Sequence, residues 1–238
     1  MTVSYDAFAL SAAGTSTRTW THTPVGTPRA IVAYVVHDGT ADDISGCTYN
    51  GVAMTEMTGS PNVLATGEGH VVYAYHLGTS LPTGAQTVEA TAISNVGLKL
   101  GYSISLQGAD DTEVVDTDTS INSTSQADPS ATLALGGRTC FCSIGFASGQ
   151  DAASGITPLT GWTARNEADA GTEVVACYTY DTVDSADVTA GWTQTAEDAC
   201  AIASAISEVQ AAAAIRLRFP PQMFAMGVGG QLGGNRLQ

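Results

Sequence analysis

Charged residues are scarce in this sequence, and basic residues are the scarcest of them. Only 13 % of the 238 residues are charged, well below the usual quarter. Eight are Lys or Arg and 23 are Asp or Glu, which gives a formal net charge of −15. Helix-rich soluble proteins use more Lys, Glu and Arg than this. The abundant Thr, Ser, Gly, Ala and Val favour strands and turns instead.

Cysteines are few, and their odd number disfavours a disulfide framework, so we expect folding in a reducing cytoplasm. Cys140 and Cys142 lie two residues apart, so on a strand they share a face with Ile144 and Phe146. Zinc would require a different spacing and histidine partners. All five are therefore predicted to be inert core thiols, namely Cys47, Cys140, Cys142, Cys177 and Cys200.

Long apolar runs and a leader pattern are also missing. The opening residues "MTVSYDAFAL" have no basic start and no long apolar run, so no signal peptide is expected. No stretch approaches 18 uninterrupted apolar residues. The sequence therefore predicts a protein made in the cytoplasm with no membrane partner.

The common motifs of catalysis and metal binding are absent. There is no GxSxG, no P-loop, no dinucleotide fingerprint and no HExxH. The strand carboxylates Glu89, Glu113 and Glu173 form no paired acidic motif of the kind glycosidases use. The acidic segments 37–43 and 109–120 lack EF-hand spacing, so they are expected to be solvated rather than to bind calcium. We expect no enzyme activity, no cofactor and no metal.

Short strand-like segments recur along the chain, with Gly, Asn, Asp and Pro at the breaks. This spacing predicts a β-sandwich or barrel. Asn50-Gly51 lies between two such segments and predicts a type I′ hairpin, because both central residues need a positive φ. The predicted strands are 3–10, 17–23, 29–38, 46–50, 52–57, 70–77, 86–92, 98–108, 112–118, 130–136, 138–148, 162–167, 172–181, 188–194 and 199–209.

The two halves of the sequence resemble each other at an offset of about 105 to 110 residues. "RAIVAYVVHDG" (29–39) parallels "RTCFCSIGFASG" (138–149), and "GHVVYAYHLG" (69–78) parallels "EVVACYTYDT" (173–182). We predict an all-β fold, a two-sheet antiparallel sandwich of jelly-roll type with internally repeated halves. Its body would span residues 1–210, with halves of about 1–109 and 110–210. Two tandem immunoglobulin-like domains are the alternative.

The C-terminal segment 211–238 differs from this body. The body carries five basic and 23 acidic residues, a formal charge of −18, whereas the segment has three arginines and no acid. Pro220-Pro221 and the Gly-rich end prevent it from folding alone. We therefore predict an extended docking arm that orders on another surface. Its contact residues would be Ile215, Arg216, Leu217, Arg218, Phe219, Met223, Phe224, Met226 and Arg236.

The negative charge of the body excludes one class of partner. A surface this acidic repels phosphate backbones, so no direct binding to nucleic acid is expected. Anionic membranes are disfavoured for the same reason.

Four tyrosines occupy equivalent places in the two halves. Tyr73 and Tyr75 share one strand face, and Tyr178 and Tyr180 share another. They could form a platform that stacks against sugars, or they could pack in the core as aromatics usually do in sandwiches. A glycan-binding site at these four residues is therefore an open alternative.

Several motifs resemble those of β-sandwich proteins encoded in the structural modules of tailed bacteriophages. These are "TWTHTPVGTPRAIVAYVVHDGT" (19–40), "ISGCTYNGVAMTEM" (44–57), "LPTGAQTVEATA" (81–92) and "LGYSISLQGADDTEVVD" (100–116). Asn50 replaces the first of two glycines typical of the family hairpin, which preserves the turn chemistry. The resemblance covers about residues 15–210, and its motifs are structural.

The resemblance implies a non-enzymatic virion protein, such as a capsid decoration or cement protein, a head fibre, or a head–tail attachment protein. Its implied partners are other virion proteins (major capsid, portal or tail proteins) and copies of itself. A lectin-like module on a phage surface that contacts host glycans is the alternative. The resemblance brings no catalytic residues with it.

Overall fold

The computed structural model describes residues 2–209 except 66, 68, 79–80, 95–98, 111–114, 151–152 and 170–172. Almost all of its regular structure is β-strand. Within the described residues, the one helical element is a short 3₁₀ turn, η1 (Ala153–Gly155). None of the described helical structure has the length and apolarity needed to cross a membrane.

The first half of the chain forms two antiparallel sheets. Its larger sheet, the first inner sheet, has the order β1-β10-β3-β8-β6, with β7 also paired to β8. The members are β1 (Ser4–Leu10), β10 (Lys99–Gln107), β3 (Ala30–Asp38), β8 (His70–Gly78), β6 (Thr55–Glu56) and β7 (Asn62–Leu64). The first outer sheet consists, in spatial order, of β2 (Arg18–His22), β9 (Gln86–Ala92), β4 (Ile44–Tyr49) and β5 (Val52–Ala53).

The second half repeats this plan. Its larger sheet, the second inner sheet, has the order β11-β18-β13-β16-β15. The members are β11 (Val115–Gln126), β18 (Glu197–Ser207), β13 (Cys140–Ser148), β16 (Val174–Asp184) and β15 (Trp162–Asp169). The second outer sheet consists, in spatial order, of β12 (Ser130–Leu133), β17 (Val188–Thr193) and β14 (Thr157–Pro158).

The strand order confirms the predicted all-β sandwich class. In the first half, β1-β10-β3-β8 face β2-β9-β4-β5, and successive strands mostly alternate between the two sheets. This is the strand order of a jelly roll, and the second half has the same order except for its shorter outer sheet. The number of sheets differs from the expectation of one pair, because each half builds a two-sheet sandwich of its own.

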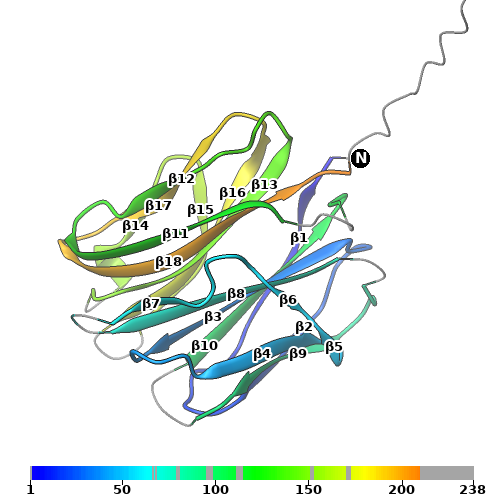
Figure 1. The fold of residues 1–238 in the computed structure, drawn as a ribbon. Helices are drawn as coiled ribbons and strands as arrows, with labels where there is room; N and C mark the ends of the chain where they lie inside the picture. The colour runs from blue at the N-terminus through cyan, green and yellow to red at the C-terminus, as the bar shows by residue number, and fades with distance from the viewer. Residues whose placement is uncertain are drawn as a thin grey trace, which may run out of the picture.

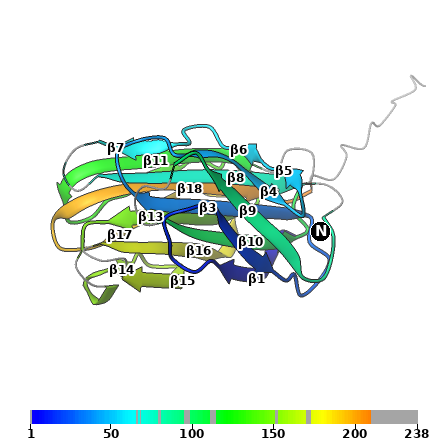
Figure 2. The same ribbon diagram turned by 90° about the horizontal axis from the view of Figure 1, so that it is seen from below.

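The four sheets stack as layers, with the two inner sheets in contact. Figure 1 shows the second half, coloured bright green to orange, lying along the first half, whose colours run from blue through cyan to the green of β10. In Figure 2, β4 and β9 of the first outer sheet cross in front of the first inner sheet. Three buried apolar clusters separate the layers: one inside the first half, one inside the second half and one between the halves.

Layering explains why the inner strands are apolar at nearly every position. On β3, Ile31 and Val35 face the core of the first half, whereas Val32, Tyr34 and Val36 face the second half. Successive side chains of a strand point to opposite faces, so a strand buried on both faces needs a continuous apolar run. "AIVAYVV" and "CFCSIGFA" are such runs, and all of their residues are buried.

Strands of the outer sheets alternate instead, because one of their faces meets solvent. On β9, Val88 and Ala90 are buried in the first half, whereas Thr87 is exposed. On β17, Val188 and Ala190 are buried and Thr189 is exposed. The molecule is therefore closed by two polar outer faces rich in Thr and Ser.

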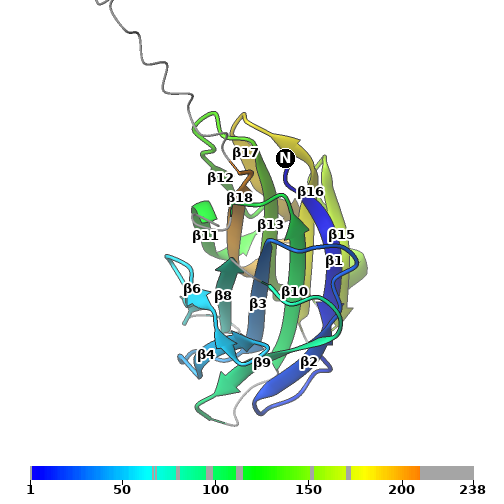
Figure 3. The same cartoon turned by 90° about the vertical axis from the view of Figure 1, so that its right-hand side faces the viewer.

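The two halves pack reciprocally, as the subunits of a two-fold dimer do. The first strand of the second half, β11, lies against β7 at the edge of the first half. The equivalent contact joins β1 to β15, where the guanidinium carbon of Arg165 lies 3.9 Å from the centre of the Tyr5 ring. Figure 3 shows β1 beside β15 along this edge. The equivalent central strands β3 and β13 contact each other.

Candidate functional site

The predicted docking residues, from Ile215 to Arg236, all lie outside the described residues. The structure does describe the point from which the arm leaves the body. This point, which we call the arm root, consists of Ser207, the last residue of β18, and of Glu208 and Val209, which follow it. The arm root and its contacts form the candidate site.

Backbone hydrogen bonds fix the arm root to both halves. Val209 N donates to Gly108 O over 3.2 Å, and Asp110 N donates to Ser207 O over 2.8 Å. Glu208 N donates to the carbonyl of Thr139 over 3.0 Å. Residues 108–110 belong to the link that joins the halves, whereas Thr139 directly precedes β13 in the second half. The arm therefore starts from a point held by the inter-half link and by a central strand.

Two arginines in equivalent positions brace this junction. Arg29 precedes β3 and donates from Nε to the carbonyl of Ala109 over 3.3 Å. Arg138 lies just before β13 and donates from Nη2 to the hydroxyl of Ser207 over 3.0 Å. Each arginine thus reaches the end of the last strand in its own half. Both open the repeated segments "RAIVAYVV" and "RTCFCSIG", so the repeat itself was the signal that could have identified them.

The repeat also shows where a strand following β18 would be expected to lie. After β10, the chain crosses to the other half and pairs along β18 as β11. By the two-fold relation, a segment after β18 would cross back and pair along β10. That position is filled, because β10 is already paired with β1 on one side and with β3 on the other. The body therefore has no free strand position for the arm at the place that the repeat assigns to it.

The aromatic residues proposed to stack against sugars do not form an exposed platform. Tyr73, Tyr75 and Tyr178 are at most 2 % exposed. The Tyr73 hydroxyl accepts hydrogen bonds from the backbone N–H groups of Asp43 and Ile44, and donates to the Asp42 carboxylate over 3.1 Å. Side chains this buried cannot stack on a ligand in solution, so a glycan site at these three residues is wrong. They pack in the cores of their own halves.

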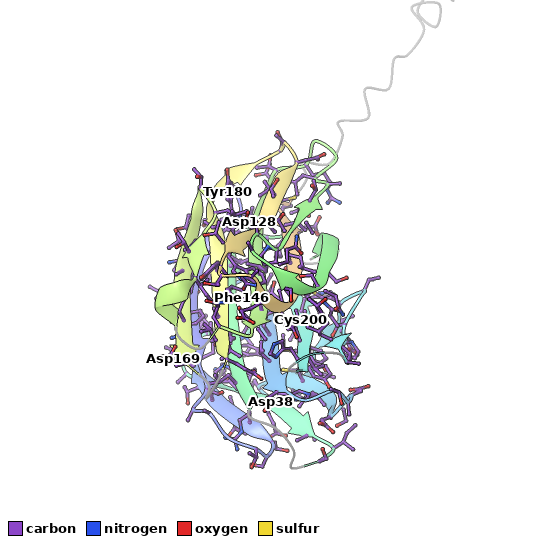
Figure 4. The ribbon with its side chains drawn as sticks, turned by 90° about the vertical axis from the view of Figure 1, so that its left-hand side faces the viewer. Asp38, Asp128, Phe146, Asp169, Tyr180 and Cys200 are labelled. Atoms are coloured by element: carbon purple, nitrogen blue, oxygen red, sulfur yellow. The ribbon has the colours of Figure 1, made fainter. Side chains whose placement is uncertain are left out.

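Tyr180 is the exception among the four, because it is half-buried. Its ring packs edge-on against Trp162, with ring centroids 5.7 Å apart. Gly161 lies so close beneath it that an added Cβ would be 2.5 Å from the Tyr180 ring. Figure 4 labels Tyr180 near one end of the second half, Phe146 in its interior and Cys200 beside the boundary with the first half. One half-exposed ring braced by its own sheet is a packing residue rather than a platform.

A serine–histidine pair is present, but it is buried. Ser103 Oγ lies 2.8 Å from His22 Nδ1 and also accepts the indole N–H of Trp20 over 2.8 Å. Since Trp can only donate, the Ser103 proton is free to point toward His22 Nδ1. Burial lowers the pKa of His22 to about 4, so the ring is neutral at pH 7. Ser103 and His22 have no exposed surface, which keeps any substrate from the hydroxyl.

Two further histidines lie fully buried near carboxylates, where β3 ends and β8 begins. His70 Nδ1 is 3.3 Å from Glu173 Oε2, a contact that joins the two halves. His37 Nε2 is 3.9 Å from Asp43 Oδ2, and its Nδ1 lies 2.7 Å from the carbonyl of Asp38. Neither pair gathers a third metal-ligating side chain, and no metal-binding group of three or more occurs among the described residues. The predicted acidic segment falls largely on 111–119, whose side chains are outside the described residues.

The cysteines behave as the sequence predicts. All five are buried and none forms a disulfide bond. Burial raises the pKa of the Cys47 and Cys200 thiols to about 12, and it also raises the pKa of Cys177. The shared face of Cys140, Cys142, Ile144 and Phe146 lines the core of the second half.

Comparisons with known proteins add little to this picture. No protein-family model matches the chain, and no curated protein matches it. A comparison with solved structures finds the crystal structure of PBSX exported protein XepA, with a TM-score of 0.23 and 9 % sequence identity over 86 % of each chain. A likeness this distant carries no argument about function.

Proposed function

We propose that this chain is a non-enzymatic structural protein of a bacteriophage particle, attached to another virion protein through the arm of residues 211–238. The most specific form of this proposal is a capsid decoration or cement protein, or a head–tail attachment protein. The body would be the displayed part. The assignment to a phage particle rests on the resemblance of the sequence motifs.

One observation carries the attachment role. The strand position that the internal repeat would give to the arm is occupied by β1. The arm is apolar and has three arginines, yet Pro220-Pro221 and its glycines prevent it from forming a core alone. A segment with this composition, whose repeat-equivalent strand position is already filled, is suited to fold on a different surface.

The completeness of the body supports the same role. β18, the last strand, is paired on both sides, with β11 and with β13. Among the described residues, the last strand thus leaves no side open next to the point from which the arm departs. This is consistent with an arm that is available for a partner.

The chemistry of the arm defines the partner surface. Arg216, Arg218 and Arg236 would pair with carboxylates, and Phe219 and Phe224 would fill apolar pockets. A surface that is acidic at its rim and apolar at its centre fits this arm. Such a surface would belong to a major capsid, portal or tail protein, or to a neighbouring copy of this chain.

Deletion of residues 215–238 tests the proposal. We expect the truncated protein to keep the melting temperature of the full chain, because the last described strand, which ends at Ser207, is already paired on both sides. We also expect it to be lost from phage particles purified by sedimentation. A matched variant in which Arg216, Arg218 and Arg236 are replaced by Gln keeps the length and apolar residues, and should show weaker incorporation that depends less on salt than that of the parent.

The outcomes separate attachment from internal stabilisation. If the truncated body unfolds at a clearly lower temperature, the arm completes its own domain. If it is stable and still sediments with the particles, attachment through the arm is wrong.

A further inference from the structure

We propose that the face between the two inner sheets is a self-sufficient protein–protein interface of the two-fold kind, so that the halves stay together without a covalent link. The partner that fits the first inner sheet is therefore a second jelly roll of the same strand order. The chain would be a fused dimer that has kept its dimer interface. This inference is independent of the role proposed for the arm.

The reciprocal contacts are the first support. On one side, the Asn62 side chain of β7 donates to Ile121 O of β11 over 2.7 Å and to Ala201 O of β18 over 2.9 Å. On the other side, Arg165 of β15 lies over the ring of Tyr5 in β1. At both sides of the interface, an edge strand of one half thus contacts the first strand of the other half. An interface that contacts itself in this way is the isologous arrangement of a homodimer.

The interior of the interface is the second support. Its buried cluster combines apolar side chains of β3, β8 and β10 with others from β13, β16 and β18. Polar groups beside it form hydrogen bonds across the boundary. Tyr102, for example, donates its hydroxyl to Val175 O over 2.9 Å. A continuous apolar core of this kind is typical of permanent interfaces.

Close packing between Tyr34 and Gly145 makes the interface specific. A Cβ added to Gly145 would lie 2.4 Å from the Tyr34 ring, so only glycine allows this approach. The Tyr34 ring therefore lies directly against the backbone of β13. A single methyl group at this position should push the inner sheets apart.

The ends of the link show why it can be cut. Asp110 N donates to Ser207 O, and the chain pairs again where Val115 lies opposite Ile206. The two ends of segment 111–114 are thus held on adjacent residues of β18. A break between them removes none of the contacts described above.

The test is to cut the folded full-length protein once between its halves and to ask whether the two fragments stay associated. A protease site inserted within residues 111–114 is cleaved after folding, and the products are studied by sedimentation at concentrations down to about 1 µM. We expect the two fragments to stay in a 1:1 complex with the hydrodynamic size of the uncut protein. Fragments that separate under these conditions would overturn the proposal.

Two glycine substitutions in the nicked protein test whether the face between the inner sheets holds the fragments together. Gly145→Ala should weaken association roughly tenfold to a hundredfold, as expected for overpacking a core. Gly101→Ala is the matched control, because its added Cβ would lie 2.5 Å from Trp20 inside the first half. It should lower the melting temperature and leave association within about threefold of the parent. Equal effects of the two variants, or no effect of Gly145→Ala, would also refute the assignment.

Discussion

The phenol oxygen of Tyr34 lies 2.8 Å from the hydroxyl oxygen of Ser143, and the two residues belong to different halves of the chain. The same phenol is 2.8 Å from Ser204, and the two serines are 3.2 Å from each other. All three residues are fully buried. Three hydroxyl groups thus form a closed network inside an otherwise apolar interface. Desolvation by burial raises the pKa of Tyr34, which keeps it protonated.

Tyr34→Phe should destabilise the protein by about 1–2 kcal/mol, because it removes two buried hydrogen bonds and leaves the serines to pair only with each other. Denaturant unfolding measures this change. Tyr49→Phe is a suitable control, since Tyr49 makes a single, longer bond of 3.2 Å to Pro82 O within the first half. We expect Tyr49→Phe to lower the free energy of unfolding by less than Tyr34→Phe does. A Tyr34→Phe protein as stable as the parent would show that the network adds nothing.

The hairpin at Asn50 gives a second prediction. Asn50 and Gly51 have φ values of 51° and 74°, as a type I′ turn requires, and both are exposed. Asn50→Val should destabilise by about 1–2 kcal/mol, because a β-branched residue resists a positive φ. Asn50→Gly should be close to neutral.

The control for the hairpin is Thr87→Val. Thr87 is an exposed residue of β9, where a β-branched side chain suits the extended backbone. Thermal unfolding of the three variants is sufficient to compare them. Equal stability of Asn50→Val and Thr87→Val would contradict the role of the left-handed conformation.

Much of the fold could be predicted from local patterns. The turn at Asn50-Gly51 and strands such as Gln86–Ala92 were identifiable because turn chemistry and hydrophobic runs are local properties. The repeated halves were also visible. The number of layers was not predicted, although "AIVAYVV" carried the information. A run without alternation indicates a strand buried on both faces, and a single pair of sheets cannot bury both faces of a strand.

Other features depend on partners distant in sequence. β11 runs from Val115 to Gln126, well beyond the predicted 112–118, because its Ser- and Thr-rich second part is an edge strand of a sheet. The tyrosine faces were predicted correctly as shared faces, but alternation alone does not say which face meets solvent. Arg29 and Arg138 were missed because their partners, Ala109 and Ser207, lie about seventy or more residues away.

The cysteines should be unreactive in the folded protein. Attack on a thiol reagent requires the thiolate, and burial raises the pKa of Cys47 and Cys200 to about 12. We expect a colourimetric thiol reagent at pH 8 to label none of the five in native protein and all five after denaturation. Fast labelling of one thiol in native protein would reveal local opening at that strand.

Acidification should destabilise the protein partly through His22. Burial lowers the pKa of His22 from 6.5 to about 4 in the folded state. The unfolded chain therefore binds more protons between these values, and stability falls as pH decreases from about 6.5 toward 4. The loss from this residue should reach up to about 3 kcal/mol near pH 4. Burial also lowers the pKa of His76, which adds a contribution of the same sign.

His22→Gln isolates the contribution of this one ring. The variant loses the contact to Ser103 and should be less stable than the parent at pH 7. Its free energy of unfolding should nevertheless fall less steeply between pH 6.5 and 4.5, because no proton is taken up at this position on unfolding. Denaturant titrations at several pH values give both quantities. If the two proteins lose stability in parallel over this range, the acid sensitivity arises elsewhere, and the buried His22 ring is not its source.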